Sequence, residues 1–405
     1  MSIESSQVET PKKIAIVGIQ DEYTRNIIIK SFKKILPDLQ ILQFSTTTTL
    51  TFTSAKIVHW LEYEDIDFFN QTLLNKHSQL VNSYCIRKGL IRKANFNFNI
   101  RKYLSKNQNS ILKSSIPETW YFEVTHKDYL DEALEEIFEV VNECKENDER
   151  INEEKVKFIL KPSLGNKGAE IKIFDSIDQL RSVFEGKHDL KEDEDDDESI
   201  FHIRDWVVQR YISNPLLIRN RKFHIRSYIL AISNLQVYLY KDMLALFALN
   251  AYAPTDINDA LSHLTNTCLQ VNEVSFKESN QVKLFWDLST KDDEGEVGII
   301  SKLDLEMIFN QIKSILNDCF DSIVNEVTQF MPMENAFELF GFDFLVDHEM
   351  NAYLLEANSF PDFKQTGDEL SHVISNLFED TIKLAIVPFF DVEYINDHDS
   401  KFCMS

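Results

Sequence analysis

FGFDFLVDHEMNAYLLEANSFP, residues 340–361, consists of two apolar runs around a short polar segment, which is the pattern of a β-hairpin. With residues 348–351 as the turn, antiparallel pairing places Asp343 directly opposite Glu356. Residues two apart share one face of a strand, so Asn358 lies on the same face. The other face would carry four apolar side chains, Phe342, Phe344, Leu355 and Ala357.

The facing carboxylates of this hairpin require a compensating charge, because like charges directly opposite one another destabilise a sheet. Mg²⁺ prefers oxygen ligands and is commonly held by one or two carboxylates together with phosphate oxygens. Asp343, Glu356 and Asn358 are therefore candidate Mg²⁺ ligands. Spacing alone leaves open the alternative that they form the solvent-facing side of an edge hairpin.

A second segment, FILKPSLGNKGAEI (158–171), has groups suited to binding phosphate. It predicts a strand, a glycine-containing turn and a second strand, and backbone N–H groups in such a turn can point at phosphate oxygens. The spacing is not that of a GxxxxGK[ST] loop, which disfavours a P-loop fold. The candidate residues of this segment are Lys161, Ser163, Gly165, Lys167 and Gly168.

A third segment, RNRKFHIRSYI (219–229), places three side chains on one face if it forms a strand: Lys222, His224 and Arg226. The two cations would face an anion, whereas His224 fits equally well as a packed strand residue. Carboxylates for a metal, a lysine-bearing loop and converging cations have complementary roles. Together the three segments predict a site for a nucleotide and Mg²⁺.

The composition bounds the class of protein. The 405 residues have a net charge of −24 and a pI of about 4.8, which disfavours general nucleic-acid binding through a basic surface. No apolar stretch reaches the ~18 residues of a membrane span, and the first eleven residues lack an apolar signal core. The five cysteines show no CxxC pair or metal-ligand spacing, so we expect reduced thiols in a cytosolic protein.

Two stretches depart from the average charge in opposite directions. An acidic loop at 187–199, which contains KEDEDDDES, is expected to be solvated. The stretch 82–115 contains many Lys and Arg residues, from Arg87 to Lys113, and no acid. It is either a pair of amphipathic helices with a solvated basic face or a docking face for an acidic or phosphorylated partner.

From about residue 12 to residue 389 the sequence resembles the tubulin–tyrosine ligase family, a branch of the ATP-grasp enzymes. The blocks that carry the resemblance occur in the family's order: ILKPSLGNKG, VVQRYISNPLLI, RKFHIRSYIL, HLTNTCLQ, FELFGFDFLVD and LLEANSFP. The implied fold class is mixed α+β and α/β, with two ATP-grasp subdomains that sandwich ATP after a small α/β domain. The expected boundaries are 1–75, 76–216 and 217–405, with the Mg²⁺ site in the last.

The resemblance also implies roles for individual residues. Lys161 would touch the α- and β-phosphates, and the loop 163–168 would close over the nucleotide. Gln209 and Tyr211 would lie beside the adenine, and Asn266 near the ribose or phosphates. Lys222 would reach the phosphates and Arg226 the carboxylate that is activated, which makes these two the expected catalytic residues, while Asp343, Glu356 and Asn358 would hold Mg²⁺.

The implied reaction is ATP-dependent ligation of a carboxylate to an amine through an acyl phosphate, adding an amino acid to a protein C-terminus. Tubulin is the implied acceptor, and its acidic tail would bind the basic stretch. We expect a monomeric protein that uses ATP and Mg²⁺ and binds neither nucleic acid nor membrane.

Three departures from the family weaken the implied activity. The family motif RKFDIR reads RKFHIR, so that His224 replaces an acid; Leu246 stands where a further arginine is expected; and the loop contains Glu170 where relatives have glycine. Within the family the sequence resembles a fungal member of cytoplasmic processing bodies that is associated with the mRNA decapping enzyme, and relatives of that member can carry a preceding SurE-like domain. The alternative is therefore an ATP-grasp binding module with weak or no ligase activity that docks a peptide of the decapping machinery.

Overall fold

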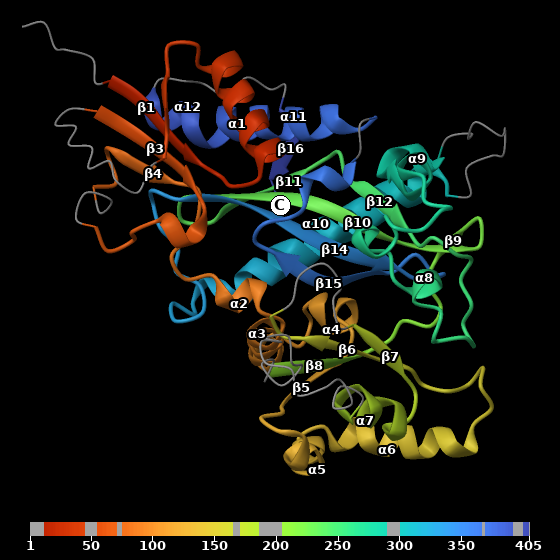
Figure 1. Ribbon diagram of the computed structural model, residues 1–405. Coiled ribbons are helices and arrows are strands. Elements are labelled where there is room, and N and C mark those ends of the chain that lie inside the picture. The colour runs from red at the N-terminus through yellow and green to blue at the C-terminus, as the bar shows by residue number, and fades with distance from the viewer. Residues whose placement is uncertain are drawn as a thin grey trace, which may run out of the picture.

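The computed structural model describes residues 12–44, 55–70, 75–164, 171–185, 205–289, 300–366, 369–391 and 400–404, and its three sheets are stacked along the molecule (Figure 1). The mixed α+β class expected from the sequence is confirmed. In the described ranges no helix has both the length and the apolar character needed to cross a membrane. The division of the chain at residues 75 and 216 stays a prediction.

The first sheet is parallel and has the order β2-β1-β3-β4. The sequence predicts a strand at 12–19 and then a helix at 23–36 that Pro37 ends, and both are present. After β1, helix α1 begins at Asp21, whose carboxylate accepts from the Thr24 N–H at 2.8 Å, and it ends before Pro37. The elements are β1 (Lys12–Gly18), α1 (Glu22–Ile35), β2 (Gln40–Gln43), β3 (Ala55–Leu61), a 3₁₀ turn (Tyr63–Asp65) and β4 (Gln79–Val81).

The basic stretch forms helices that connect this sheet to the next one: α2 (Lys88–Ile91), α3 (Lys93–Lys106) and α4 (Leu112–Ser115). The second sheet has the order β5-β8-β6-β7, with strands β5 (Thr119–Glu123), β6 (Phe158–Pro162), β7 (Lys172–Phe174) and β8 (Asp205–Arg210). Its outer face packs around the fully buried Trp206 against α5 (Leu130–Glu135), α6 (Phe138–Glu146) and α7 (Ile177–Glu185).

The helical spacing of apolar residues over 126–147 predicts a single helix, which is wrong in detail. The segment is broken into a 3₁₀ turn (Lys127–Tyr129), α5 and α6, followed by a 3₁₀ turn (Asn147–Glu149). At the second break, Ile137 leaves the helical region with φ −118° and ψ 38°, and its side chain is completely buried. The spacing of Ser176 and Gln179 is that of a capping box, which predicts a helix start at Ser176. Helix α7 does start there, since the Ser176 hydroxyl accepts from the Gln179 N–H at 3.4 Å.

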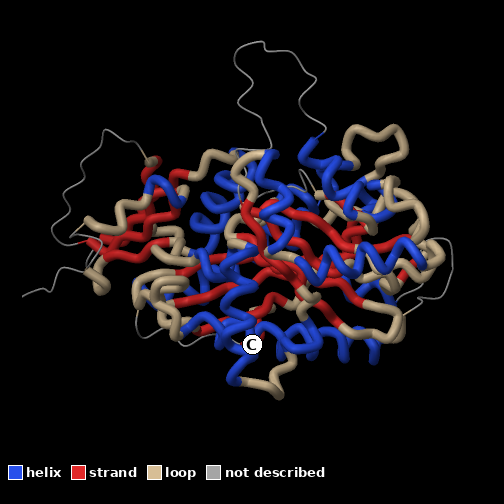
Figure 2. Tube along the Cα trace, turned by 90° about the horizontal axis from the view of Figure 1, so that it is seen from below, coloured by secondary structure: helices blue, strands red, loops and turns tan. Residues whose placement is uncertain are grey.

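The third sheet has eight strands built around the long strand β10, which pairs antiparallel with β9, β11, β12 and β14. One face packs on α10, and the other on α11 and α12, so that helices lie on both sides of the strands (Figure 2). The strands are β9 (Leu217–Ile218), β10 (Arg221–Ile232), β11 (Gln236–Tyr240), β12 (Leu244–Phe247), β13 (Val282–Leu284), β14 (Phe337–Val346), β15 (Ala352–Asn358) and β16 (Phe402–Met404).

The helices of this part begin with α8 (Ala260–His263) and α9 (Glu278–Gln281), and α10 (Lys302–Val324) starts at a capping box formed by Ser301 and Asp304. They continue with α11 (Ser371–Thr381), a π-helical turn (Ile382–Ile386) and α12 (Val387–Phe390). Short 3₁₀ turns cover Thr267–Leu269, Phe285–Ser289 and Phe363–Thr366.

The predicted hairpin is formed by β14 and β15, and Asp343 does lie opposite Glu356. The predicted turn length and the predicted regular pairing between the turn and these two residues are wrong. The turn is one residue longer, because the Asp347 carboxylate accepts from the N–H groups of residues 349 and 351, both at 2.9 Å. A β-bulge at Leu355 then restores the register, so Leu355 does not share the apolar face with Phe344 but lines a pocket beside Glu356.

Candidate functional site

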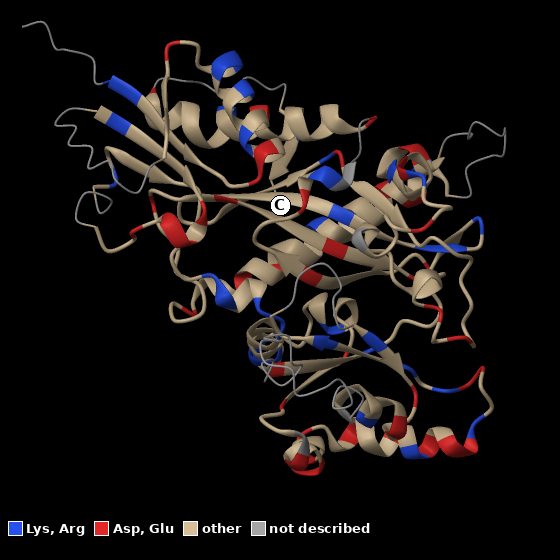
Figure 3. Ribbon diagram, in the orientation of Figure 1, with Lys and Arg blue, Asp and Glu red and all other residues tan. Residues whose placement is uncertain are grey.

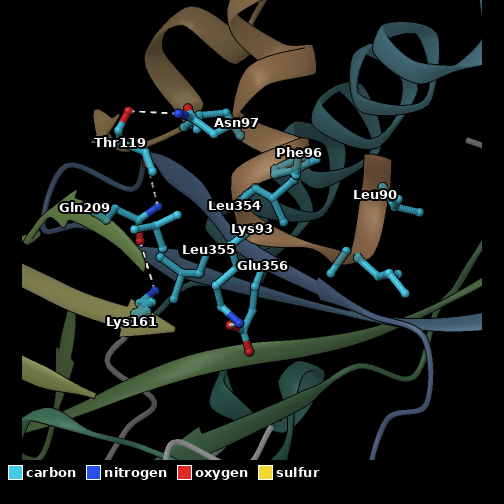
Figure 4. A pocket seen from close by; sticks show the side chains of 14 residues that line it. Leu90, Lys93, Phe96, Asn97, Thr119, Lys161, Gln209, Leu354, Leu355 and Glu356 are labelled. Carbon is cyan, nitrogen blue, oxygen red and sulfur yellow. Dashed lines mark hydrogen bonds and ion pairs between the residues drawn. The ribbon is translucent and has the colours of Figure 1, made fainter. Parts of the chain in front are cut away.

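The site lies where the second sheet, of order β5-β8-β6-β7, faces strands β10, β14 and β15 of the third sheet. Figure 4 shows Thr119, Gln209 and Lys161 on the second sheet near Glu356 of β15 and Lys93 of α3. On the third sheet, acidic and basic residues lie next to one another on the central strands (Figure 3). The structure therefore gathers the lysines, the arginine and the carboxylates predicted from three separate segments.

Arg226 and Asp343 form a buried, two-pronged ion pair between directly opposed residues of β10 and β14. The Arg226 Nε donates to Asp343 Oδ1 at 2.5 Å, and a terminal nitrogen donates to Oδ2 at 3.1 Å. Burial opposes the charge of Arg226, but Asp343 outweighs it and raises the pKa of the guanidinium. The pair holds both side chains in one geometry, as bidentate arginine–carboxylate pairs do.

Glu356 is paired with Lys93 at the start of α3, with Nζ and Oε2 3.1 Å apart. Burial alone would raise the pKa of this carboxyl, but Lys93 and Lys161 outweigh burial and lower the pKa to about 2. Asn358 lies between the two carboxylates, since its Nδ2 is 3.3 Å from Glu356 Oε1 and 3.5 Å from Asp343 Oδ2. The predicted group of two carboxylates and an amide is present.

Lys161 is buried at the end of β6, and its ammonium donates to Gln209 Oε1 at 3.0 Å. Gln209 is held in turn by its donation to Thr119 Oγ1 at 3.1 Å. Burial lowers the pKa of Lys161 to about 8, although Glu356 works in the opposite direction. A buried ammonium with one neutral acceptor can readily bind an anionic ligand.

Lys222 is also buried and donates to the Tyr211 hydroxyl at 2.9 Å, while that hydroxyl lies 2.7 Å from His263 Nδ1. Burial and the nearby charge of Lys161 lower the pKa of Lys222 to about 7. The two lysines thus raise the positive potential of one small region. Gln209 and Tyr211, expected beside an adenine, each hold one of these lysines, and their place relative to a nucleotide stays a prediction.

His224 lies on the same face of β10 as Lys222 and Arg226, with Nδ1 2.5 Å from Thr265 Oγ1. Its Nε2 lies 3.7 Å from Asp343 Oδ1 and has no hydrogen-bond partner within the described ranges. Burial lowers its pKa to about 4, so the imidazole is neutral at pH 7. Leu246 is paired opposite His224 and completely buried, so an apolar side chain occupies the position where the resemblance implies an arginine.

The remaining predicted residues are only partly placed. Ser163 joins β6 to α3, because its hydroxyl accepts from the Ala94 N–H at 3.2 Å. Asn266 is half-buried and follows Thr265, the contact of His224. Gly165, Lys167 and Gly168, the acidic loop at 187–199 and Glu170 lie outside the described residues.

The donor atoms at the candidate metal site suit Mg²⁺, which binds few protein ligands, better than a metal ion that is coordinated by protein side chains alone. Among the described residues, no group of three or more His, Cys, Asp or Glu side chains is arranged to hold a metal. Asp343, Glu356 and Asn358 offer two carboxylates and one amide, and Mg²⁺ commonly completes such a set with phosphate oxygens and water. In the structure as described, Arg226 and Lys93 neutralise the same carboxylates.

Lys93 is the functional candidate that sequence reasoning missed, since it was counted only as one charge of the basic stretch. That stretch does form helices, and three of its cations are used in ion pairs with acids far along the chain: Arg87 with Glu338, Lys93 with Glu356 and Lys102 with Glu326. Those left exposed for docking are Arg92, Arg101, Lys106 and Lys113. Arg87 stacks on the Tyr63 ring at 3.7 Å from its centre, which indicates a structural role.

Comparisons with known proteins identify the family. The model of the tubulin–tyrosine ligase family matches residues 72–394. A probable tubulin–tyrosine ligase of Schizosaccharomyces pombe is 39% identical, with 98% of this chain and 97% of the relative covered. The probable tubulin–tyrosine ligase PBY1 of Saccharomyces cerevisiae is 34% identical over 96% of this chain, which spans 54% of that relative.

A solved structure is also similar over nearly the whole chain. It is the C-terminal domain of Pby1 from K. lactis, described as an ATP-grasp enzyme that interacts with the mRNA decapping enzyme Dcp2. The two share 32% identity with a TM-score of 0.68, over 97% of this chain and 98% of the other.

Proposed function

Because the chain belongs to the tubulin–tyrosine ligase family and has the ATP-grasp fold expected from its sequence, we propose that it binds ATP with Mg²⁺ and ligates an amino acid to a protein carboxylate. The observation that carries the proposal is the convergence of Lys161 and Lys222 with the pair Asp343 and Glu356 at one junction of two sheets. Cations for phosphate and carboxylates for a metal lie within reach of one another.

The proposed reaction has two steps. An oxygen of the acceptor carboxylate attacks the γ-phosphorus of ATP, the bond to the bridging oxygen breaks, and ADP leaves. The amine of the amino acid then attacks the acyl carbon, inorganic phosphate departs with the carbon–oxygen electron pair, and the nitrogen loses a proton as the amide forms. Mg²⁺, when bound, supplies charge neutralisation at the phosphate oxygens.

This chain's residues have separate tasks in that reaction. Lys161 and Lys222 bind phosphate oxygens, which stabilises the charge that develops there. Asp343, Glu356 and Asn358 would hold the metal, and Arg226 and Lys93, which pair with these carboxylates in the structure, would turn to anionic groups of the substrates. Arg226 is then the residue that orients the acceptor carboxylate or the acyl phosphate.

Binding is tested by thermal unfolding with and without ATP and Mg²⁺, comparing the native protein with Glu356→Gln. A ligand at ~100 times its dissociation constant adds about 2.7 kcal/mol to the free energy of unfolding. We expect a clear rise in melting temperature that Glu356→Gln reduces. The absence of any shift at saturating nucleotide would contradict the nucleotide site.

Turnover is tested by incorporating labelled tyrosine into tubulin or into peptides with the sequence of its tails. Tubulin is the acceptor we propose, since the relatives are named for it, and its acidic tail would be attracted by the exposed cations of the basic stretch, such as Arg92 and Lys113. Label in the tail that depends on ATP and is lost in Arg226→Ala supports ligation. ATP binding without incorporation of any amino acid would remove the ligase proposal and leave the binding site.

A second function is favoured by Leu246, because a buried leucine beside His224 cannot supply the cation expected for the acyl substrate. We propose as the alternative a nucleotide-binding module that docks a peptide of the decapping machinery in cytoplasmic processing bodies, as a monomer. The similar K. lactis domain is described as interacting with a decapping enzyme. Leu246→Arg restores the cation. A gain in amino-acid incorporation by that variant would support the view that the chain is a binding module that descends from a ligase.

A further inference from the structure

His224 is a buried side chain at the site that has no task in the proposed reaction. Its Nδ1 lies 2.5 Å from Thr265 Oγ1, but its Nε2 is buried and has no hydrogen-bond partner within the described ranges. His263, by comparison, uses both ring nitrogens, with the Tyr211 hydroxyl at 2.7 Å and the Asp256 carbonyl at 3.0 Å. Buried polar atoms are nearly always hydrogen-bonded, so the unpartnered nitrogen of His224 indicates a ligand.

This nitrogen faces the proposed metal ligands. His224 and Arg226 share one face of β10, and Asp343 is directly opposite Arg226, so His224 and Asp343 are diagonal neighbours on that face. Nε2 lies 3.7 Å from Asp343 Oδ1, which is too far for a good hydrogen bond. Two atoms that each bind one ion at about 2.1 Å can be at most about 4.2 Å apart. The separation therefore allows both atoms to bind the same metal ion.

The contact with Thr265 suits a metal-binding histidine. Such histidines generally donate their other ring N–H to a neighbouring acceptor, which fixes the tautomer and the orientation of the ring. Thr265 is buried beside His224, and its hydroxyl oxygen can accept the proton of Nδ1. The lone pair is then on Nε2, on the side of Asp343, in the form in which imidazole binds metals.

A nitrogen ligand changes which metal ion suits the site. Mg²⁺ binds oxygen ligands, whereas imidazole suits first-row transition metals. The carboxylates of Asp343 and Glu356, the Asn358 amide and phosphate oxygens form an oxygen set that both Mg²⁺ and Mn²⁺ accept. Adding the His224 nitrogen to that set favours Mn²⁺ and the heavier divalent ions of the series. An aspartate at position 224, as the resemblance implies, would keep the set purely oxygen.

We propose that His224 Nε2 binds, together with Asp343, the metal ion that accompanies the nucleotide, and that the site therefore prefers Mn²⁺ or a similar transition metal to Mg²⁺. The inference rests on the proposed nucleotide site and adds to it one ligand and a metal preference. The competing role for His224 is a hydrogen bond from Nε2–H to an oxygen of a substrate. That role requires the other tautomer and places no nitrogen on the metal.

The first test uses the full chain with Mn²⁺ and a non-hydrolysable ATP analogue, and the readout is pulsed electron paramagnetic resonance. A directly bound imidazole nitrogen modulates the electron spin echo of Mn²⁺. We expect this modulation in the native protein, with a changed pattern when its histidines contain ¹⁵N, a label that leaves the adenine nitrogens unchanged. His224→Asn should lose the modulation. His59→Asn, the same substitution on β3 of the first sheet, should keep it.

The second test measures the metal preference by displacing bound Mn²⁺ with Mg²⁺ and following the signal of free Mn²⁺. His224→Asn should weaken Mn²⁺ binding about tenfold and Mg²⁺ binding much less, because only the first ion uses the nitrogen. His224→Asp should shift the preference towards Mg²⁺, because the ligand becomes an oxygen. The control His59→Asn should leave both affinities unchanged.

Bound Mn²⁺ without coupling to a histidine nitrogen would overturn the ligand role of His224 and leave the proposed nucleotide site intact. Coupling that persists in His224→Asn would assign it to another histidine and also overturn the inference. Equal losses of Mn²⁺ and Mg²⁺ binding in that variant would show that His224 acts through packing. If the variant does not fold, the ¹⁵N label in the native protein decides. Failure of the nucleotide site itself is detected separately, as the absence of a thermal shift with ATP.

Discussion

Replacing Lys93 by methionine should destabilise the protein through Glu356, although the two residues belong to distant segments of the chain. The substitution keeps the apolar stem of the side chain and removes its charge. It leaves a carboxylate whose side chain is only 20% exposed with one of its two neighbouring cations missing. A buried charge that loses its partner is among the few causes of large destabilisation by a single substitution.

The magnitude follows from the pKa of Glu356, which falls from an ordinary 4.5 to about 2. That difference corresponds to roughly 3 kcal/mol in favour of the ionised carboxylate, contributed mainly by Lys93 and Lys161. We therefore expect Lys93→Met to lower the free energy of unfolding by about 1–2 kcal/mol at pH 7. Because the folded-state pKa is depressed, this stabilisation is complete above pH 4.5 and is lost as the pH falls towards 2.

The assay is a double-mutant cycle with Lys93→Met, Glu356→Gln and the double variant, measured by urea unfolding. The loss in the double variant should be smaller than the sum of the single losses by about 1–2 kcal/mol. Lys106→Met is the matched control, since Lys106 is exposed on the same helix, and it should leave stability unchanged. A coupling below about 0.3 kcal/mol would refute the assignment of Lys93 as the counter-ion of Glu356.

Three further predictions concern other charges of the site and its support. ATP should bind more weakly as the pH rises above 7, by up to about tenfold per pH unit, because phosphate favours the charged form of Lys222, whose pKa in the free protein is about 7. Calorimetry in buffers of different ionisation heat would show proton uptake on ATP binding, and the absence of proton uptake would contradict this prediction. His224→Asp places a third carboxylate near Asp343 and should lower the free energy of unfolding by about 1–3 kcal/mol without divalent cations and by less with Mg²⁺. If melting experiments show the same loss with and without Mg²⁺, that result would argue against the metal site. Arg87→Ala should lower the free energy of unfolding by about 3–5 kcal/mol at pH 8 and by less at pH 6, because burial raises the pKa of Glu338 to about 7 and the protonated acid needs no cationic partner. A loss that does not change with pH in urea unfolding would contradict this prediction.

The alternation of polar and apolar residues predicted which groups of the hairpin meet, but not how. Asp343 and Glu356 are opposite one another because two deviations cancel, a turn lengthened by Asp347 and a bulge at Leu355. A period-two pattern cannot reveal either, since a bulge changes the count of one strand without changing the type of residue on each face. The pairing was therefore predictable and the position of Leu355 was not.

The basic stretch shows the opposite limit. Its composition predicted helices and an unusual charge, yet Arg87 and Lys93 turn inward to acids that come more than two hundred residues later in the chain. Local sequence has no information about such long-range partners, because the partner positions depend on how three sheets stack. The absence of any acid within the stretch is the one signal that pointed to partners elsewhere.

We propose that a metal ion and nucleotide phosphates replace Arg226 and Lys93 at the carboxylates of Asp343 and Glu356. The most direct measurement is a crystal structure with a non-hydrolysable ATP analogue and Mn²⁺, using the anomalous signal of manganese to locate the ion. We expect a manganese peak among the oxygens of Asp343, Glu356 and Asn358, with Lys93 and Arg226 turned towards phosphate. If nucleotide is bound while the Asp343–Arg226 pair stays intact and no manganese lies beside it, these carboxylates do not form the metal site.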